Sequence, residues 1–151
     1  MTQTSFLPAL RELASTYQAF EAYSAAHIRT LGLTPAQFDI IATLGNTPGM
    51  PLKELGEKSL ITKGTLTGVV DRLADKQLVR RVASPSDGRS QIVQLTKEGE
   101  ALFARIFPEH LAYMARAFAK LEPVDLANLV KALRQLSAAF ATARAQKEET
   151  P

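Results

Sequence analysis

The sequence predicts a mainly α-helical protein, in which a winged helix-turn-helix lobe is joined to a helical dimerisation lobe built from the N- and C-terminal helices. Three observations predict this class. Apolar residues recur at helical spacing through most of the chain. Two short helical segments, 51–58 and 63–76, follow each other closely, as in a helix-turn-helix unit. Directly after them, residues 78–95 become rich in branched residues around a polar turn, which is typical of a β-hairpin, or wing.

The size and composition of the chain limit its class. Its 151 residues, 46% of them hydrophobic, are enough for one domain with its own core. The chain has no cysteine, which excludes disulfides and thiolate metal sites, and we expect neither a metal nor a cofactor. The polar N-terminus is not typical of a signal peptide, and no run reaches the roughly 18 to 20 apolar residues that span a bilayer. We therefore expect a soluble, cytoplasmic protein without membrane contact.

Positive charge is concentrated in one part of the chain. Residues 51–97 hold nine lysines and arginines and five acidic residues, so the net charge of this segment is +4 (nine minus five), although that of the whole chain is only +3. Localised positive charge is expected of a protein that binds a polyanion such as nucleic acid. A solvated surface has the same charge pattern, so charge alone does not decide between the two.

The first two helices have different start signals. A helix is predicted over about residues 5–29, with Ser5 as a candidate N-cap. In "TPAQ", Thr34 is predicted to be the N-cap of the second helix, with Pro35 at its first position and Gln37 at its third, which together form a capping box. The buried face of the second helix is predicted to consist of Phe38, Ile41 and Leu44.

The two helices of the helix-turn-helix unit follow. Pro51 begins a short helix that ends near Ser59, and Thr62 is a candidate N-cap for a helix over about Lys63–Lys76. The buried positions of the second of these helices are predicted to be Leu66, Val69, Val70 and Leu73. A surface helix normally exposes long charged side chains, but the outer face of this helix begins with short ones and includes Gly64 and Gly68. Such a surface allows another molecule to approach the backbone closely.

The remaining elements are a hairpin and two long helices. Residues 78–95 predict two strands joined by the turn-forming run "SPSDGRS". Thr96 is predicted to cap a helix that extends to about Lys120, in which Pro108 should cause a kink or loosen one turn. Pro123 begins the final helix. These helices are longer than the small core requires, so their apolar faces need a partner, which is most simply a second copy of the chain.

Two runs suggest a family. The run "LKELGEKSLITKGTLTGVVDRLADKQLVRR" resembles the multiple antibiotic resistance regulator (MarR) family of bacterial transcription factors, and so does "SDGRSQIVQLTKEGE". The order and spacing of the helices match as well. Three residues depart from the family pattern: Gly68 replaces a residue that is often arginine or polar, Gln77 replaces a common glycine at a helix end, and Leu60 occupies a turn position often held by glycine.

The resemblance implies both a domain organisation and a function. It implies a single MarR-type domain over residues 1–151, with dimerisation helices at 5–33 and 97–145 and the winged helix-turn-helix lobe at 34–96. A homodimer would bind palindromic double-stranded operator DNA, most commonly as a repressor. The recognition helix would enter the major groove, and Arg89 at the wing tip would enter the minor groove, where a salt bridge from Asp87 would orient it. The candidate DNA-binding residues are Lys53, Lys58, Thr62, Lys63, Gly64, Thr65, Thr67, Gly68, Arg72, Arg81, Asp87 and Arg89.

Family members often bind small aromatic acids or other lipophilic molecules, which release the DNA. The residues that could line such a site are Tyr17, Phe20, Tyr23, His27, Phe38 and Ile41. An aromatic stripe at helical spacing is, however, more often part of a core. The candidates for the dimer interface are Leu7, Leu10, Phe107, Leu111, Leu129, Leu133 and Leu136.

Alternatives remain for single residues and for the whole chain. Thr62 is equally consistent with a simple helix cap, and Arg72 with a pairing to Asp75 or to a backbone carbonyl. Arg80 and Arg81 should point to opposite faces of one strand, so at most one of them should face DNA. An enzyme is disfavoured, because the chain has two histidines, no cysteine and no glycine-rich phosphate loop. A winged-helix module that binds another protein is the main alternative, although the polar and basic outer face favours nucleic acid.

Overall fold

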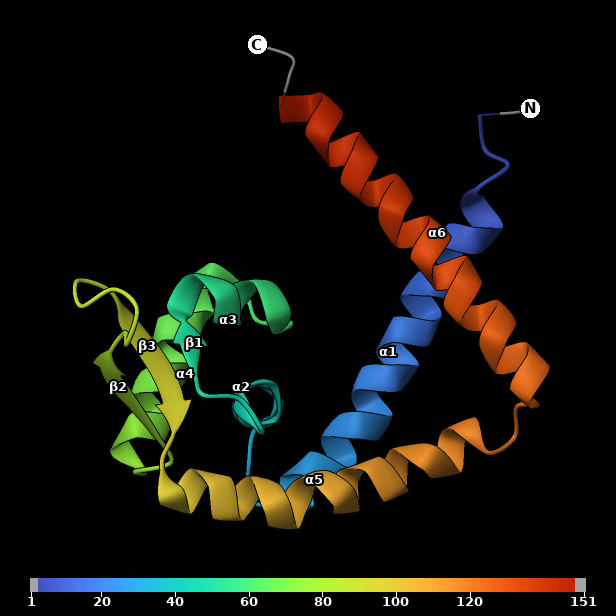
Figure 1. The fold of residues 1–151 in the computed structure, drawn as a ribbon. Coiled ribbons are helices and arrows are strands. Elements are labelled where there is room, and N and C mark those ends of the chain that lie inside the picture. Colours follow the sequence, from blue (N-terminus) through green and yellow to red (C-terminus); the bar gives the residue numbers. More distant parts are fainter. Residues whose placement is uncertain (1–2, 149–151) are drawn as a thin grey trace. The chain divides into compact units, whose positions relative to one another are not determined.

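The computed structural model describes residues 3–148, which form two compact units, one up to Tyr113 and one from Met114. The described residues are mostly helical and include one small antiparallel sheet (Figure 1), which confirms the predicted fold class. The helices are α1 (Leu7–Thr30), α2 (Pro35–Leu44), α3 (Leu52–Lys58), α4 (Lys63–Asp75), α5 (Lys97–Phe118) and α6 (Pro123–Glu148), and the strands are β1 (Met50–Pro51), β2 (Val79–Ala83) and β3 (Gln91–Leu95).

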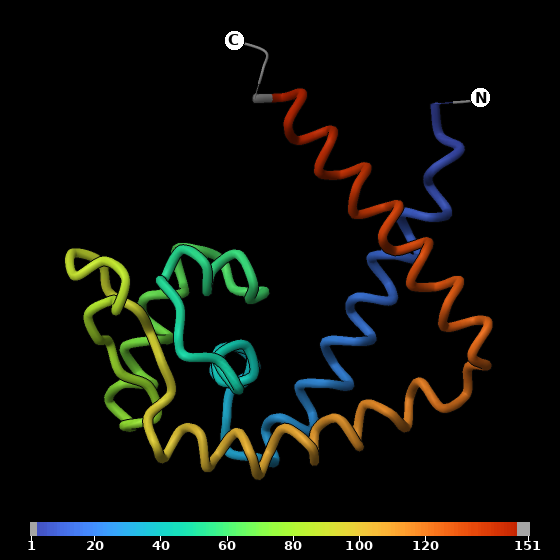
Figure 2. Tube along the Cα trace, in the orientation of Figure 1, coloured from blue at the N-terminus to red at the C-terminus, as the bar shows by residue number. Residues whose placement is uncertain are grey.

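The sheet contains the predicted hairpin and one additional strand. The strand order is β1-β3-β2, and β2 pairs with β3 so that Val79 lies opposite Leu95 and Arg81 opposite Val93. The loop of residues 84–90 extends past the ends of these strands (Figure 2). β1 has no signal in the sequence, because two residues are too few for an alternating pattern. β1 pairs with β3 through Met50 and Val93 and connects the end of α2 to the start of α3.

Helix α2 begins with a side-chain cap, whereas α1 does not. The predicted capping box of α2 is present: Gln37 N–H donates to Thr34 Oγ1, and Thr34 N–H donates to Gln37 Oε1, both at 3.1 Å. In α1 the prediction of Ser5 as N-cap is wrong, because the helix begins at Leu7 and Phe6 occupies the cap position without a side-chain hydrogen bond. Pro8 lies in the first turn, where its missing N–H would have no helical partner in any case.

Helix α4 begins and ends close to the predicted positions. Its predicted buried residues, Leu66, Val69, Val70 and Leu73, all lie in the core. Thr62 occupies the N-cap position, but its side chain makes no capping hydrogen bond and instead lies 3.2 Å from the Thr65 hydroxyl.

The unusual glutamine, Gln77, lies in the turn that ends α4. Gln77 has φ of 61°, in the left-handed region that favours glycine. Its N–H donates to Ala74 O at 2.9 Å, and Leu78 N–H donates to Leu73 O at 3.0 Å, which together form a Schellman motif. A side chain therefore occupies a backbone conformation that is more favourable for glycine.

Helix α5 begins at the predicted cap, because Thr96 Oγ1 accepts from Gly99 N–H at 3.0 Å. The helix continues through Pro108 to Phe118, two residues before the predicted end. In the second unit, none of the described side chains of α6 is buried, and its apolar residues are largely exposed in the single chain. In the described part of the chain, no helix combines the length and apolarity that crossing a bilayer requires.

A polar cluster joins α1 to α5 within the first unit. His27 Nδ1 lies 2.9 Å from His110 Nδ1, and Ser24 Oγ lies 3.2 Å from His110 Nε2. Tyr113 stacks on His27 with ring centroids 4.5 Å apart, and Phe38 from α2 lies against His110. His110 is buried, and this burial, together with the nearby His27, lowers its pKa below the ordinary histidine value. We call these residues the histidine cluster.

Replacement of Gln77 by glycine should stabilise the protein. The left-handed conformation disfavours a residue with a Cβ by about 1–2 kcal/mol, and the greater freedom of glycine in the unfolded chain offsets part of this, so we expect a gain of about 0.5–1 kcal/mol. Urea unfolding at fixed protein concentration measures the change. Gln77→Ala keeps the Cβ and should give no gain; equal stabilities of the glycine and alanine variants would contradict this explanation.

The histidine cluster should make stability depend on pH. Because the folded-state pKa of His110 is lowered, the native protein binds fewer protons than the unfolded chain once the pH falls below the ordinary value of about 6.5. The contribution of His110 to stability is therefore complete above that pH and is lost as the pH falls through the lowered pKa.

His110→Gln is the matched variant for this effect. Unfolding measured between about pH 7.5 and pH 5 should show a steeper loss of stability in the parent than in the variant. Asp39, whose pKa is raised by burial, acts in the opposite direction at lower pH, but it is common to both proteins. Parallel curves for the two proteins would contradict the role of His110.

Candidate nucleic-acid interface

The outer face of α4 is open. The residues predicted to form it, Thr62, Lys63, Gly64, Thr65, Thr67 and Gly68, are all exposed. A Cβ placed on Gly64 or Gly68 would meet no atom within 4 Å outside its own stretch of helix, so neither glycine is required by packing inside the chain. Each glycine destabilises a helix by about 1 kcal/mol relative to alanine, so the lack of side chains at these two positions lowers the stability of α4. Such a surface suits the close approach of a partner.

The basic residues around this face differ in their surroundings. Lys53 is exposed, and Lys58 forms an ion pair with Glu54 at 2.9 Å one turn earlier in α3. Arg72 is exposed, and it makes neither of the two pairings considered from the sequence, to Asp75 or to a backbone carbonyl, among residues 3–148. The guanidinium of Arg72 is therefore available to an anion that approaches α4.

The wing tip has its own network of hydrogen bonds. Asp87 Oδ1 accepts from Arg89 N–H at 3.1 Å, and Asp87 O accepts from Ser90 N–H at 3.1 Å. The prediction of a salt bridge between Asp87 and the Arg89 side chain is therefore wrong, because the carboxylate binds the backbone of the turn. This bond shapes the loop and leaves the exposed Arg89 guanidinium outside any ion pair within the described residues.

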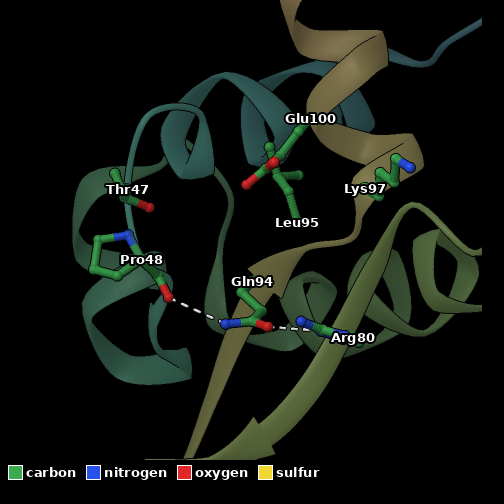
Figure 3. Close-up of a pocket in the computed structure, with 7 residues that line it drawn as sticks. All are labelled: Thr47, Pro48, Arg80, Gln94, Leu95, Lys97 and Glu100. Carbon is green, nitrogen blue, oxygen red and sulfur yellow. Dashed lines mark hydrogen bonds between the residues drawn. The ribbon is translucent and has the colours of Figure 1, made fainter. Parts of the chain in front are cut away.

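The two strand arginines lie on opposite faces, as expected. Arg81 Nη2 contacts Asp71 Oδ1 of α4 at 2.6 Å. Arg80 Nε donates to Gln94 Oε1 at 2.6 Å on the other face of the sheet, and Gln94 Nε2 donates to Pro48 O at 3.2 Å. Figure 3 shows this second network at the edge of a polar cavity of about 300 Å³, which is also lined by Thr47, Leu95, Lys97 and Glu100. No candidate DNA-binding or ligand-binding residue lines this cavity.

The candidate ligand residues lie in three different environments. Tyr17 and Phe20 are exposed and pack against each other on α1. Tyr23 and His27 belong to the contact between α1 and α5: Tyr23 stacks on Tyr113 and donates its hydroxyl proton to Tyr113 O at 2.8 Å. Phe38 and Ile41 are buried in the core, with exposed fractions of 8% and 0%. The structure therefore does not bring all six residues around one cavity.

The candidate dimer residues are divided between the two units. In the single chain Leu10 and Leu111 of the first unit are exposed, and so are Leu129 and Leu133 of the second. Leu7 and Leu136 are half-buried. Phe107 packs on the edge of the core and stacks on Phe103, so that it already has partners inside its own unit.

Two acidic residues that organise this region, Asp39 and Asp71, are not among the residues predicted from the sequence. Asp39 Oδ2 of α2 accepts from Leu60 N–H at 2.7 Å, which holds the turn between α3 and α4, and its burial raises its pKa. Leu60 is 73% exposed and is not in the left-handed region, so the turn does not require glycine there. Asp71 holds Arg81. Partners 21 and 10 residues apart leave no local pattern in the sequence.

Comparison with known proteins agrees with this fold and surface. A model of the MarR family matches residues 33–91. The chain is 32% identical to the HTH-type transcriptional regulator MhqR of Bacillus subtilis over 124 residues, 82% of this chain and 86% of that protein. It is 27% identical to the homoprotocatechuate degradative operon repressor of Escherichia coli over 140 residues, 92% of each.

Among solved structures, that of Bordetella bronchiseptica BpsR superposes with a TM-score of 0.74 at 27% identity, over 91% of this chain and 96% of that one. DNA binding by BpsR is regulated by 6-hydroxynicotinic acid. The similarity to MhqR extends over most of both chains. The family model covers the helix-turn-helix unit and most of the hairpin. The chain therefore belongs to the MarR family and is a DNA-binding transcriptional regulator rather than an enzyme.

Proposed function

We propose that the protein represses transcription as a homodimer that binds a palindromic operator and is released by a small aromatic ligand. In each subunit α4 lies in the major groove and the wing tip reaches the adjacent minor groove. The domain organisation follows from this: residues 34–96 form the DNA-binding lobe, and the flanking segments 5–33 and 97–145 form the dimerisation lobe.

The open outer face of α4 carries this proposal. A helix that reads base edges must lie deep in the major groove, so short side chains at its start favour a close fit. Gly64 and Gly68 leave space above the backbone, and Thr65 and Thr67 offer hydroxyl groups for phosphates or bases. The partial positive charge at the N-terminus of α4 favours a phosphate at Lys63. A protein-binding module would more often present an apolar patch on this face.

Exposed apolar side chains support the homodimer. Helix α6 is 26 residues long and buries none of its described side chains in the single chain, and Leu10 of α1 and Leu111 of α5 are also exposed. Large exposed apolar faces of this kind usually mark an interface. A twofold axis would place the two recognition helices about 34–36 Å apart, one turn of DNA, which fits a palindrome.

The aromatic residues of α1 support a small-molecule ligand. Tyr17 and Phe20 expose ring surface, and His27 offers its Nε2 to a carboxylate, because its Nδ1 already lies against His110. DNA binding by the related BpsR is regulated by 6-hydroxynicotinic acid, an aromatic acid. A ligand that binds next to the histidine cluster would act on the contact between α1 and α5. A thermal-shift series of aromatic acids tests this part of the proposal separately from DNA binding.

The experiment for the main proposal is a binding titration with duplex DNA from the region upstream of the protein's own gene, compared with a scrambled duplex. We expect tighter binding to the upstream duplex, two chains per palindrome by light scattering, and an affinity that falls steeply with salt because bound phosphates release counterions. A monomeric protein, or equal affinity for both duplexes, would contradict the proposal.

Arg89→Ala should weaken operator binding by about 10- to 100-fold, because the wing would lose its contact with the narrow groove. The dependence of log affinity on log salt should also become shallower by about one if Arg89 neutralises a phosphate on the way. Arg105→Ala removes the same charge from an exposed site on α5 and should change the affinity little. Equal effects of the two variants would exclude a specific contact by the wing.

A further inference from the structure

A carboxylate lies on the face of α4 that is proposed to meet DNA. Gly64, Gly68 and Asp71 follow each other at spacings of four and three, so they share one face of the helix. The Asp71 side chain is 57% exposed. By charge alone, a carboxylate at this position repels phosphates and should weaken DNA binding. Its presence therefore needs an explanation that involves its contacts.

The contact of Asp71 is to the wing. Arg81 Nη2 lies 2.6 Å from Asp71 Oδ1, and the Arg81 side chain is 31% exposed. In the register of the hairpin, Arg81 lies on the same face of β2 as Val79, which packs in the core. Arg81 thus extends the inner face of β2 beyond its last buried residue and meets α4 there.

No second side-chain bond joins these two elements. Among the hydrogen bonds and ion pairs of residues 3–148, the Asp71–Arg81 pair is the one side-chain contact between α4 and the hairpin. Nearer the end of α4, the hairpin is held by the buried Val79 and by the Schellman turn at Leu78. Farther along, toward the loop with Arg89, β3 is held by its pairing with β1 and by the buried Ile92 and Val93. The ion pair adds the one polar side-chain contact, among residues 3–148, between β2 and the outer face of α4.

We propose that Asp71 is a positioning residue of the DNA interface: by holding Arg81 it fixes the base of the wing against α4 and so determines where Arg89 reaches. The inference rests on the proposed function, in which α4 and the wing tip contact the same duplex. Asp71 itself does not bind DNA, and Arg81 acts through the ion pair rather than by a separate phosphate contact.

The direction in which one substitution changes DNA affinity distinguishes this positioning role from simple electrostatics. Asp71→Ala removes a negative charge from the interface, so charge alone predicts tighter binding to every duplex. Loss of positioning predicts the opposite, a loss of operator affinity of roughly three- to tenfold, the size expected from a coupling between residues in contact. Alanine is a good helix former and the ion pair is partly exposed, so the melting temperature should change little.

Two further variants test the mechanism. Arg81→Gln should weaken operator binding about as much as Asp71→Ala, and the double variant should be no weaker than either single one, because both remove the same contact. Asp71→Glu should recover part of the affinity. Arg80→Gln is the matched control: it removes the same charge at the neighbouring position, on the opposite face of β2, and should have the smaller effect.

Coupling to the wing tip is the most specific measurement. Arg89→Ala should weaken binding less in the Asp71→Ala background than in the parent, because Arg89 is no longer held in place there. Tighter or unchanged binding by Asp71→Ala would overturn the inference, and so would strictly additive effects of the Asp71 and Arg89 substitutions. If Arg89→Ala has no effect in the parent, the wing contact in the proposed function fails instead, which is a distinguishable result.

Discussion

The DNA-binding lobe depends on the packing of the inner face of α4. Leu66, Val69, Val70 and Leu73 are buried against α2 and the sheet, and this packing fixes which side of the helix faces outward. Burial of such side chains contributes about 1.5–3 kcal/mol each, more than the roughly 1 kcal/mol lost at each helical glycine. The packing of the inner face can therefore keep α4 helical even though the glycines of its outer face, which allow DNA to approach closely, destabilise the helix.

Several short contacts then place the polar groups of the interface around this helix. Asp39 holds the turn that precedes α4, and the Schellman motif at Gln77 directs the chain from α4 into the hairpin. Asp87 binds the backbone of the wing tip instead of the Arg89 guanidinium. Both carboxylates, Asp39 and Asp87, bind backbone N–H groups within the basic segment 51–97. The surface can therefore keep a net positive charge while these carboxylates hold its turns in place.

Features with a local signal were predicted from the sequence, and features that depend on distant partners were not. The capping box at Thr34 and the cap at Thr96 depend on neighbouring residues, and the buried face of α4 on helical period. The two-residue strand β1, the bond from Asp39 to Leu60 and the pair of His27 with His110 depend on folding of separate segments onto each other. The outer face of α4 was found from composition, but its network with the wing was not.

The most direct measurement is the protection of a single thiol on α4. The chain has no cysteine, so Thr67→Cys on the open face and Asn128→Cys on exposed α6 each carry one reactive group. Alkylation of each is followed while operator duplex is added and binding is monitored in the same sample. The thiol at position 67 should become protected in proportion to the fraction bound, whereas the thiol at 128 should react at an unchanged rate. A thiol at 67 that reacts equally fast in the bound protein would show that this face does not lie against DNA.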